Sequence, residues 1–222
     1  ILRLPAFPLH LLVIILLCIW SITFFIKKQL WSRNEWQLAV ITFVAFVVVI
    51  AIQGFIPYYA GGEWYFDWYE HYVRMRFFLD RLPLETRFGP YLLTARPPLF
   101  NVVAYFYATL LGKDFWVFQL TSSFLNLLPI LSCFLLFRRI LKQHTSAFVL
   151  MVLAAIFLLN PSFIIQVTFT WTKGLAAYFV LTGFYFYLTY RRGKPPAYVY
   201  LSFIFLAGAL LTHYSAIPFI LG

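Results

Sequence analysis

The chain has 222 residues, of which 63% are apolar and only 11% are charged, and its mean hydropathy is +0.85. Soluble domains carry about 25% charged residues, so this composition excludes a water-soluble globular domain. It also excludes intrinsic disorder, which requires low hydrophobicity. The class that remains is a polytopic all-α membrane protein, and its 22% aromatic content suits a lipid-facing surface with interfacial belts.

The excess of positive charge, 17 basic against 7 acidic residues, would suggest nucleic-acid binding in a soluble protein. In a membrane protein it belongs in the cytoplasmic loops, so we expect no nucleic-acid partner. Cys18 and Cys133 lie far apart inside apolar runs and form no metal or disulfide pattern. Because the chain starts at Ile1 without Met and stops at Gly222 after an apolar run, we expect a C-terminal part to be missing.

Six apolar stretches are predicted to cross the membrane, because a spanning helix needs about 20 apolar residues. In chain order they are residues 8–26, 37–57, 115–137, 146–160, 171–190 and 197–220. No secretory cleavage site follows the first stretch, so we expect it to be retained as a helix. These stretches predict a multi-pass protein of the inner or plasma membrane.

The segment Leu99–Leu111 is apolar but only 13 residues long, and it lies between Arg96-Pro97-Pro98 and Gly112-Lys113-Asp114. A helix of that length is too short to cross the hydrocarbon core of a bilayer, so the segment favours a re-entrant or interfacial helix. The positive-inside rule agrees, because three basic loops fall on one side only if this segment does not cross. The loops contain Lys27, Lys28 and Arg33; Arg138, Arg139 and Lys142; and Arg191, Arg192 and Lys194.

The interfacial interpretation places residues 58–114 on the outer side, together with the 160–170 turn and the region around His213. Five of the seven acids lie in residues 58–98, a loop that also carries five arginines. Loops of this length are usually functional. We therefore interpret residues 1–222 as a single membrane domain, in which residues 1–36 supply an N-terminal helix and a cytoplasmic loop.

From Glu63 onwards the external loop has helical spacing. One polar stripe contains Glu63, Asp67, Glu70 or His71, and Arg74, and an aromatic stripe beside it contains Trp64, Trp68, Tyr72 and Met75. In the functional interpretation Asp67 is a catalytic carboxylate at the membrane interface. Glu63 or Glu70 would share a metal ion or a proton with it, and His71 would act as an acid, a base or a ligand. The alternative is a solvated amphipathic helix with i,i+4 ion pairs such as Glu70 with Arg74.

Three basic residues elsewhere are candidates for the same outer face. Arg96 stands before two prolines, where its planar fork could grip a phosphate, or it could simply extend to the headgroups. Lys173 and His213 lie near the outer ends of two predicted spans, and ionisable residues at membrane depth are functional candidates by default. The alternatives are a snorkelling lysine and a hydrogen-bonded interior histidine.

This layout resembles the GT-C fold glycosyltransferases, and among them the protein O-mannosyltransferases and the lipid A aminoarabinose transferases. The resemblance covers residues 37–222. It rests on an acid after the first membrane exit, Asp67 followed by His71-Tyr72, and on the basic-Pro-Pro step Arg96-Pro97-Pro98. The link Leu111-Gly112-Lys113-Asp114-Phe115 and the pairs Arg138-Arg139 and Asn160-Pro161 also fall where such proteins carry them.

The resemblance implies transfer of a sugar from a polyprenyl-phosphate donor to an acceptor hydroxyl or amine at the outer membrane face. Asp67 would deprotonate or align the acceptor and Arg96 would hold the donor phosphate. Glu63, Glu70, His71, Tyr72, Lys173 and His213 would contact the substrate. A divalent metal ion is the one candidate cofactor, but the chain has Ala95 and Trp171-Thr172-Lys173 where relatives often have acids.

Two other functions are open at this point. One is a noncatalytic subunit, a GT-C-like scaffold in a larger membrane complex with further subunits and lipids as partners. The other is a transporter, which would require polar residues near the bilayer midplane and paired broken helices.

Overall fold

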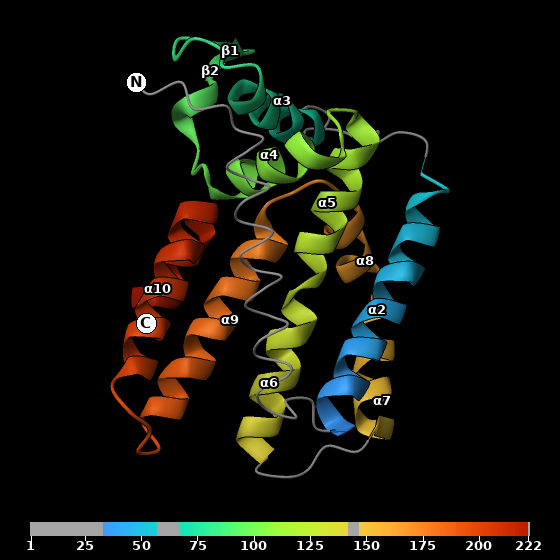
Figure 1. Cartoon of the computed structure of the whole chain (residues 1–222), viewed down its shortest axis with the longest axis vertical. Coiled ribbons are helices and arrows are strands. Elements are labelled where there is room, and N and C mark those ends of the chain that lie inside the picture. Colours follow the sequence, from blue (N-terminus) through green and yellow to red (C-terminus); the bar gives the residue numbers. More distant parts are fainter. Residues whose placement is uncertain (1–32, 57–66, 142–146, 222) are drawn as a thin grey trace.

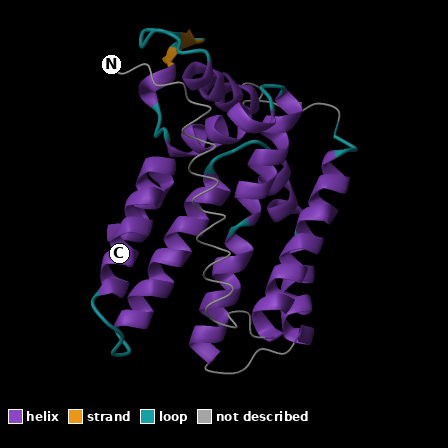
Figure 2. Ribbon diagram, viewed as in Figure 1, coloured by secondary structure: helices purple, strands orange, loops and turns teal. Residues whose placement is uncertain are grey.

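The computed structural model describes residues 33–56, 67–141 and 147–221. Most of these residues lie in helices (Figure 2), which confirms the all-α class. In the described ranges the exception is a hairpin of two short antiparallel strands, β1 (Arg87–Phe88) and β2 (Tyr91–Leu92). Gly89 lies in its turn with a φ of +57°, a conformation that favours glycine.

Most of the helices stand roughly upright beside one another (Figure 1). They are α2 (Arg33–Gln53), α5 (Phe115–Leu127), α6 (Pro129–Leu141), α7 (Ala147–Leu158), α9 (Lys173–Tyr190) and α10 (Ala197–Thr212). The helices α9 and α10 pack closely because small residues face each other. The Ser202 hydroxyl donates a hydrogen bond of 2.9 Å to the Gly183 carbonyl, a contact typical of membrane helices.

Two further helices, α3 (Asp67–Leu79) and α4 (Leu99–Leu111), lie across the upper end of the upright helices (Figure 1). With the β-hairpin and the 3₁₀ turn η2 (Leu93–Ala95) they form what we call the cap. Helix α4 covers the 13 residues predicted for it. It ends at Gly112, whose φ of +112° excludes most other residues and whose N–H donates to the Ala108 carbonyl.

The cap is attached to the bundle by a buried apolar cluster. It contains Met75 from α3, Phe100, Ala104 and Ala108 from α4, Phe118 and Leu125 from α5, and Leu175 from α9. A second cluster lies lower, among α2, α6, α7 and α8 (Pro161–Thr168), and includes Val49, Ile130 and Phe134. Because α4 buries one face in the first cluster, it belongs to the folded core as well as to the surface.

By length and apolar composition, two helical stretches of the described residues are able to cross a membrane, Trp36–Gln53 and Phe115–Ile140. They coincide with the predicted spans at 37–57 and 115–137. Five of the six predicted spans lie in the described residues, and the other three of these do not meet these criteria as single helices, because their helices are shorter or more polar. Helix α10 ends at Thr212 instead of continuing to residue 220, since His213 is extended and its ring accepts the N–H of Ser215. The predicted span at 8–26 lies outside the described residues.

The predicted span at 146–160 also differs, because it bends instead of crossing straight. Helix α7 ends at Leu158, and α8 continues at an angle of 75° to it. The cause is local: the Asn160 side chain accepts the N–H of Ser162 at 2.9 Å and Pro161 occupies the first helical turn. Counted as one broken span, this pair raises the number of candidate membrane spans from two to three.

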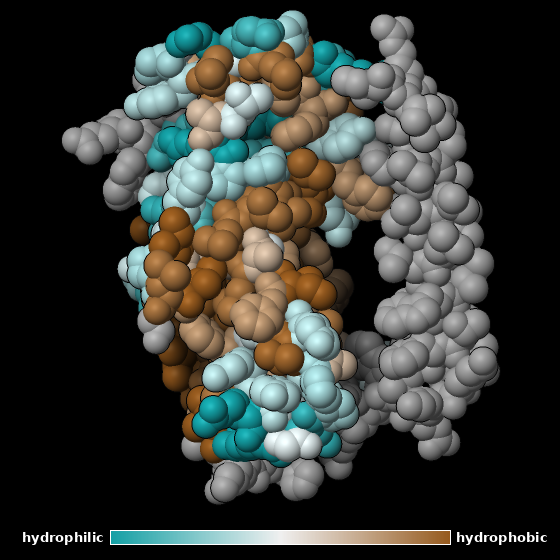
Figure 3. All heavy atoms as spheres, turned by 90° about the vertical axis from the view of Figure 1, so that its left-hand side faces the viewer, coloured by the Kyte–Doolittle hydropathy of each residue, from teal (hydrophilic) through white to brown (hydrophobic). Residues whose placement is uncertain are grey.

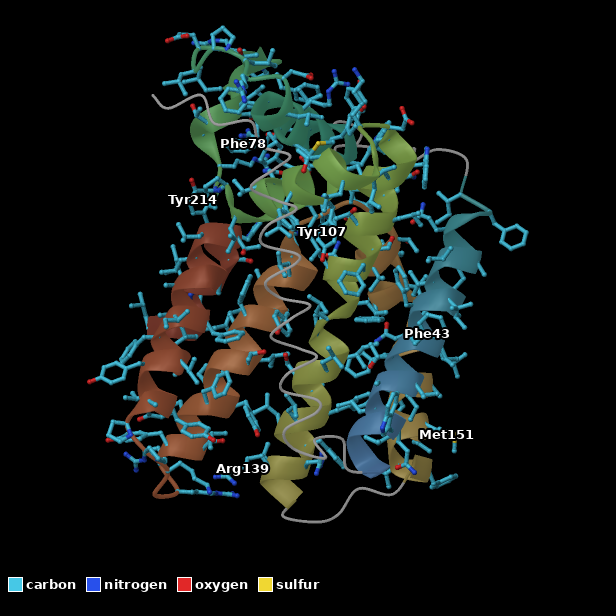
Figure 4. All side chains as sticks on the ribbon, in the orientation of Figure 1. Phe43, Phe78, Tyr107, Arg139, Met151 and Tyr214 are labelled. Carbon is cyan, nitrogen blue, oxygen red and sulfur yellow. The ribbon has the colours of Figure 1, made fainter. Side chains whose placement is uncertain are left out.

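The sides of the helix bundle are suited to contact with lipid. Figure 3 shows, over the α10 side, a band of apolar side chains between hydrophilic residues at the two ends. Phe43 on α2 and Met151 on α7 point outward (Figure 4) and are 65% and 52% exposed. The ends of α6 and α9 that carry the basic pairs lie opposite the cap, as the positive-inside argument expects (Figure 1).

Candidate functional site

The site begins with an ion pair between the two segments of the cap. Asp67 is the first residue of α3, and Arg96 follows η2 directly before the two prolines. A guanidinium nitrogen of Arg96 lies 3.7 Å from Asp67 Oδ1 and 3.1 Å from Glu70 Oε2. Asp67 and Arg96 are 30% and 34% exposed, so both remain accessible to a ligand.

Glu70 is held between two arginines. Its Oε1 accepts hydrogen bonds from Arg74 Nε at 2.9 Å and from a terminal Arg74 nitrogen at 2.5 Å, while Oε2 faces Arg96. Arg74 also donates to the carbonyls of Leu92 and Leu93. Burying a charge pair costs free energy unless its donors and acceptors are paired, and here the backbone of the hairpin and η2 completes the pairing.

The prediction of a solvated amphipathic α3 is therefore wrong in one respect. The i,i+4 pair of Glu70 and Arg74 exists, but its side chains are only 3% and 1% exposed. The charged stripe faces the rest of the cap, because residues 92–96 fold over it. In this conformation Glu70 anchors Arg96 and has no free oxygen for a substrate.

His71 lies beneath this network. It is 3% exposed, and its ring is 5.9 Å from that of Phe100 at a steep angle. Burial, helped by the positive charges of Arg96 and Arg74, lowers its pKa from 6.5 to about 3, so the imidazole is neutral at physiological pH. In the described part of the chain its Nδ1 has no hydrogen-bond partner. A role as an exposed acid or base is not open to it in this conformation.

Tyr72 connects α3 to the link between α4 and α5. Its hydroxyl donates to the Lys113 carbonyl at 3.0 Å, and its ring packs against Phe115 and Phe118 at 5.3 and 5.7 Å. Trp68, one turn earlier, also packs against Phe115. These contacts make the aromatic stripe a packing surface of the cap. The predicted contact of Tyr72 with a substrate stays a prediction.

His213 lies within electrostatic reach of Asp67, Arg96 and Lys173. The half-buried His213 has a lowered pKa because of burial and the positive charges of Lys173 and Arg96, while Asp67 acts in the opposite direction. Its Nδ1 accepts the Ser215 N–H at 3.0 Å, so the neutral ring carries its proton on Nε2. The Lys173 ammonium lies 4.0 Å from the centre of the Trp171 ring.

An apolar pocket of about 210 Å³ begins at Lys173 and follows α9. One wall is formed by α9 and the other by the segment after α10, which contains the turn η3 (Tyr214–Ala216) and α11 (Ile217–Leu221). Its lining residues are Ala176, Ala177, Val180, Leu181, Phe184, Ser215, Ala216 and Phe219. Apart from Lys173 and Ser215 the lining is apolar, which suits a hydrocarbon chain whose charged end lies at the lysine.

Two contacts that sequence reasoning missed connect the cap to distant segments. The Tyr214 hydroxyl donates to the carbonyl of Ala95, the residue before Arg96, at 3.0 Å; Tyr214 stands at the upper end of α10 in Figure 4. The Thr170 hydroxyl donates to the Trp68 carbonyl at 2.7 Å. No local sequence pattern predicts either contact, because the partners are 119 and 102 residues apart in the sequence.

Glu63 lies outside the described residues. Within the described ranges, no three of the His, Cys, Asp and Glu side chains lie close enough together to hold a metal ion. The residues that come together are thus Asp67, Glu70 and Arg96, with Lys173 and His213 nearby.

Comparison of the chain with family models, with characterised proteins and with solved structures gave no match.

Proposed function

We propose that this chain is a multi-pass membrane glycosyltransferase that moves a sugar from a polyprenyl-phosphate donor to an acceptor at the outer face of the inner or plasma membrane. The observation that carries the proposal is the pairing of Asp67 with Arg96, both accessible, at the end of an apolar bundle. A carboxylate can align or deprotonate an acceptor hydroxyl, and a guanidinium can stabilise a leaving phosphate.

The unequal contacts of Arg96 fit this division of roles. The Glu70 oxygen at 3.1 Å is the nearer partner and is buried, whereas the Asp67 oxygen at 3.7 Å is the looser one. A donor phosphate that approaches Arg96 from the exposed side would displace Asp67 and keep Glu70 as an anchor. Asp67 would then be released toward the acceptor at the moment the donor is bound.

The pocket along α9 supports a lipid-linked donor. It is apolar along its length and has Lys173 at one end, so an isoprenoid chain would lie in it with its phosphate near the lysine. Nε2–H of the neutral His213 would donate to a phosphate oxygen, because Nδ1 is occupied by Ser215. Glu63, whose structure is outside the described residues, keeps its predicted role beside Asp67.

The test is sugar transfer by purified protein in proteoliposomes, followed as release of polyprenyl phosphate from radiolabelled polyprenyl-phosphate mannose or aminoarabinose. We expect Asp67→Asn to lower turnover by about 10²–10⁴-fold, the usual contribution of a positioned base. The matched control is Asp80→Asn, because Asp80 forms a pair with Arg76 at the other end of α3. Unchanged turnover in a correctly inserted Asp67→Asn protein would refute the catalytic role.

The second candidate function is a noncatalytic scaffold subunit in a larger membrane complex. It is favoured by the burial of Glu70, His71 and Arg74. Because these residues lie inside the cap, much of the charged stripe of α3 stabilises the cap and does not face a substrate. This candidate predicts that the chain copurifies with other membrane subunits in a fixed ratio. It also predicts that Asp67→Asn leaves both the complex and its activity unchanged.

A further inference from the structure

The end of the bundle opposite the cap carries a second concentration of charge. It consists of the last turn of α6 and the connection between α9 and α10, with Arg138, Arg139, Arg191, Arg192 and Lys194. Every ion pair found among the described side chains lies in the cap. The sequence supplies one acid near this end, Glu35 in the first turn of α2, so the positive charge is largely uncompensated.

Two arginines hold the two segments of this basic end together through the backbone. Arg192 donates to the carbonyl of Arg139 at 2.8 Å, and Arg139 reaches the Thr189 carbonyl at 3.5 Å. Arg139 Nε is buried and has no acceptor in the described part of the chain. A buried N–H without a partner costs free energy. Arg139 as a whole is only partly buried and Arg192 is exposed, so both side chains reach the surface, where an acceptor from outside the protein can approach them.

The level of these arginines along the bundle indicates where that acceptor comes from. Directly above them is the apolar band, and Figure 3 shows it ending at a hydrophilic lower edge on the α10 side. Tyrosines at the same end, Tyr187, Tyr190 and Tyr200, are 43%, 36% and 67% exposed. Exposed tyrosines next to basic residues at the end of an apolar band are typical of the headgroup layer of a membrane.

We propose that the basic end, centred on Arg139 and Arg192 between α6 and α9, binds the phosphate of an anionic membrane phospholipid. The planar forks of two arginines fit phosphate oxygens, and basic pockets between helix ends bind anionic headgroups in other membrane proteins. This proposal is independent of the sugar-transfer proposal. It uses the opposite end of the molecule and none of the residues of the cap.

Native mass spectrometry of the full chain released from nanodiscs tests it. The nanodiscs contain equal amounts of phosphatidylglycerol and phosphatidylcholine, and we expect retained phosphatidylglycerol to exceed phosphatidylcholine by at least about tenfold. Arg192→Gln should lower that preference by about fivefold, the worth of one basic residue at a charged surface. Arg87→Gln, an exposed residue of the hairpin, is the matched control and should retain the full preference.

A variant that preserves charge separates lipid binding from a role in membrane orientation alone. Arg139→Lys keeps the positive charge that the positive-inside rule uses but loses the fork and the buried Nε. A reduced preference in Arg139→Lys supports a built site. A preference that stays at the unmodified protein's level in both Arg139→Lys and Arg192→Gln, or equal retention of the two lipids by the unmodified protein, overturns the proposal. Complete competition by inorganic phosphate assigns the site to a soluble anion and likewise overturns the lipid assignment.

Discussion

Arg96 lies 3.1 Å from Glu70, and this contact connects the accessible part of the cap to its buried part. Through Glu70 the guanidinium is joined to Arg74 and to the backbone of the hairpin and η2. The orientation of a partly exposed arginine is thereby set by a buried pair, Glu70 and Arg74, that is almost completely shielded from water. Such support is what a site needs to present a charged group in one geometry.

The buried pair on α3 should contribute much more to stability than its exposed counterpart. Arg74→Met leaves Glu70 with fewer partners, and we expect it to lower the free energy of unfolding by about 3–5 kcal/mol. Arg76→Met breaks the pair with Asp80, which has the same spacing on the same helix but is about one third exposed, and should cost about 1 kcal/mol or less. Chemical unfolding in detergent measures both, and equal losses would contradict the structural role of Arg74.

Adding Glu70→Gln to Arg74→Met gives a second test of the same network. Because the double variant removes both charges of the pair, it should recover part of the stability that Arg74→Met loses. The same unfolding measurement applies. A double variant that is less stable than Arg74→Met alone would show that the Glu70 carboxylate is held mainly by Arg96.

His71 should make stability depend on pH. Its folded pKa of about 3 is below the ordinary 6.5, so between these values the unfolded chain binds more protons. The contribution of His71 to the free energy of unfolding is therefore complete above about pH 6.5. It falls by about 1.4 kcal/mol per pH unit as the pH is lowered from about 6.5 toward about 3. Thermal unfolding from pH 7 to 4 should show a shallower slope in His71→Gln. His213→Gln, which removes a half-buried histidine, should change the slope less.

Gly174 should tolerate no larger residue, because α9 begins in close contact with α5. A Cβ at this position would lie 2.7 Å from the backbone Cα of Asn126 and 2.5 Å from its Oδ1. We expect Gly174→Ala to lower the free energy of unfolding by about 1–3 kcal/mol, since overpacking displaces backbone. Gly208→Ala is the control, because its nearest neighbours are Phe179 ring atoms at 3.1 Å. Equal stability of the two variants would show that α9 can move away from α5.

Replacement of Arg96 by lysine separates charge from shape in the proposed transfer reaction. Arg96→Lys keeps the positive charge but cannot contact Glu70 and a phosphate with one planar group. We expect the KM for the polyprenyl-phosphate donor to rise by about tenfold or more, the loss of one charged hydrogen bond. Steady-state kinetics measures it, with Arg87→Lys as the control. An unchanged KM would remove Arg96 from the donor site.

Helix boundaries were predictable where local chemistry determines them. The two prolines before Leu99 and the glycine after Leu111 define α4 to the residue. The bend after Leu158 was missed, although Asn160-Pro161 is a strong start signal for a helix, because the apolar run across it hides the break. The end of α10 at Thr212 was missed for a similar reason, since the residues after His213 are again apolar.

The candidate site was predictable only as a set of residues. Helical spacing correctly grouped Asp67, Glu70, His71 and Arg74 on α3, but periodicity does not tell which face another segment covers. That information lies in residues 92–96, which fold back over α3 from about twenty positions away. For the same reason burial, and with it the low pKa of His71, could not be read from the spacing.

The hydrogen bonds from Thr170 to Trp68 and from Tyr214 to Ala95 have a consequence for biosynthesis. A ribosome makes the two acceptor segments long before it makes the hydroxyl groups that secure them. The cap therefore reaches its final geometry only after α9, α10 and the turn that follows α10 have been made. A nascent chain whose synthesis stops before Tyr214 would contain every acid of the site. It would still lack the hydrogen bond that holds Ala95, the neighbour of Arg96.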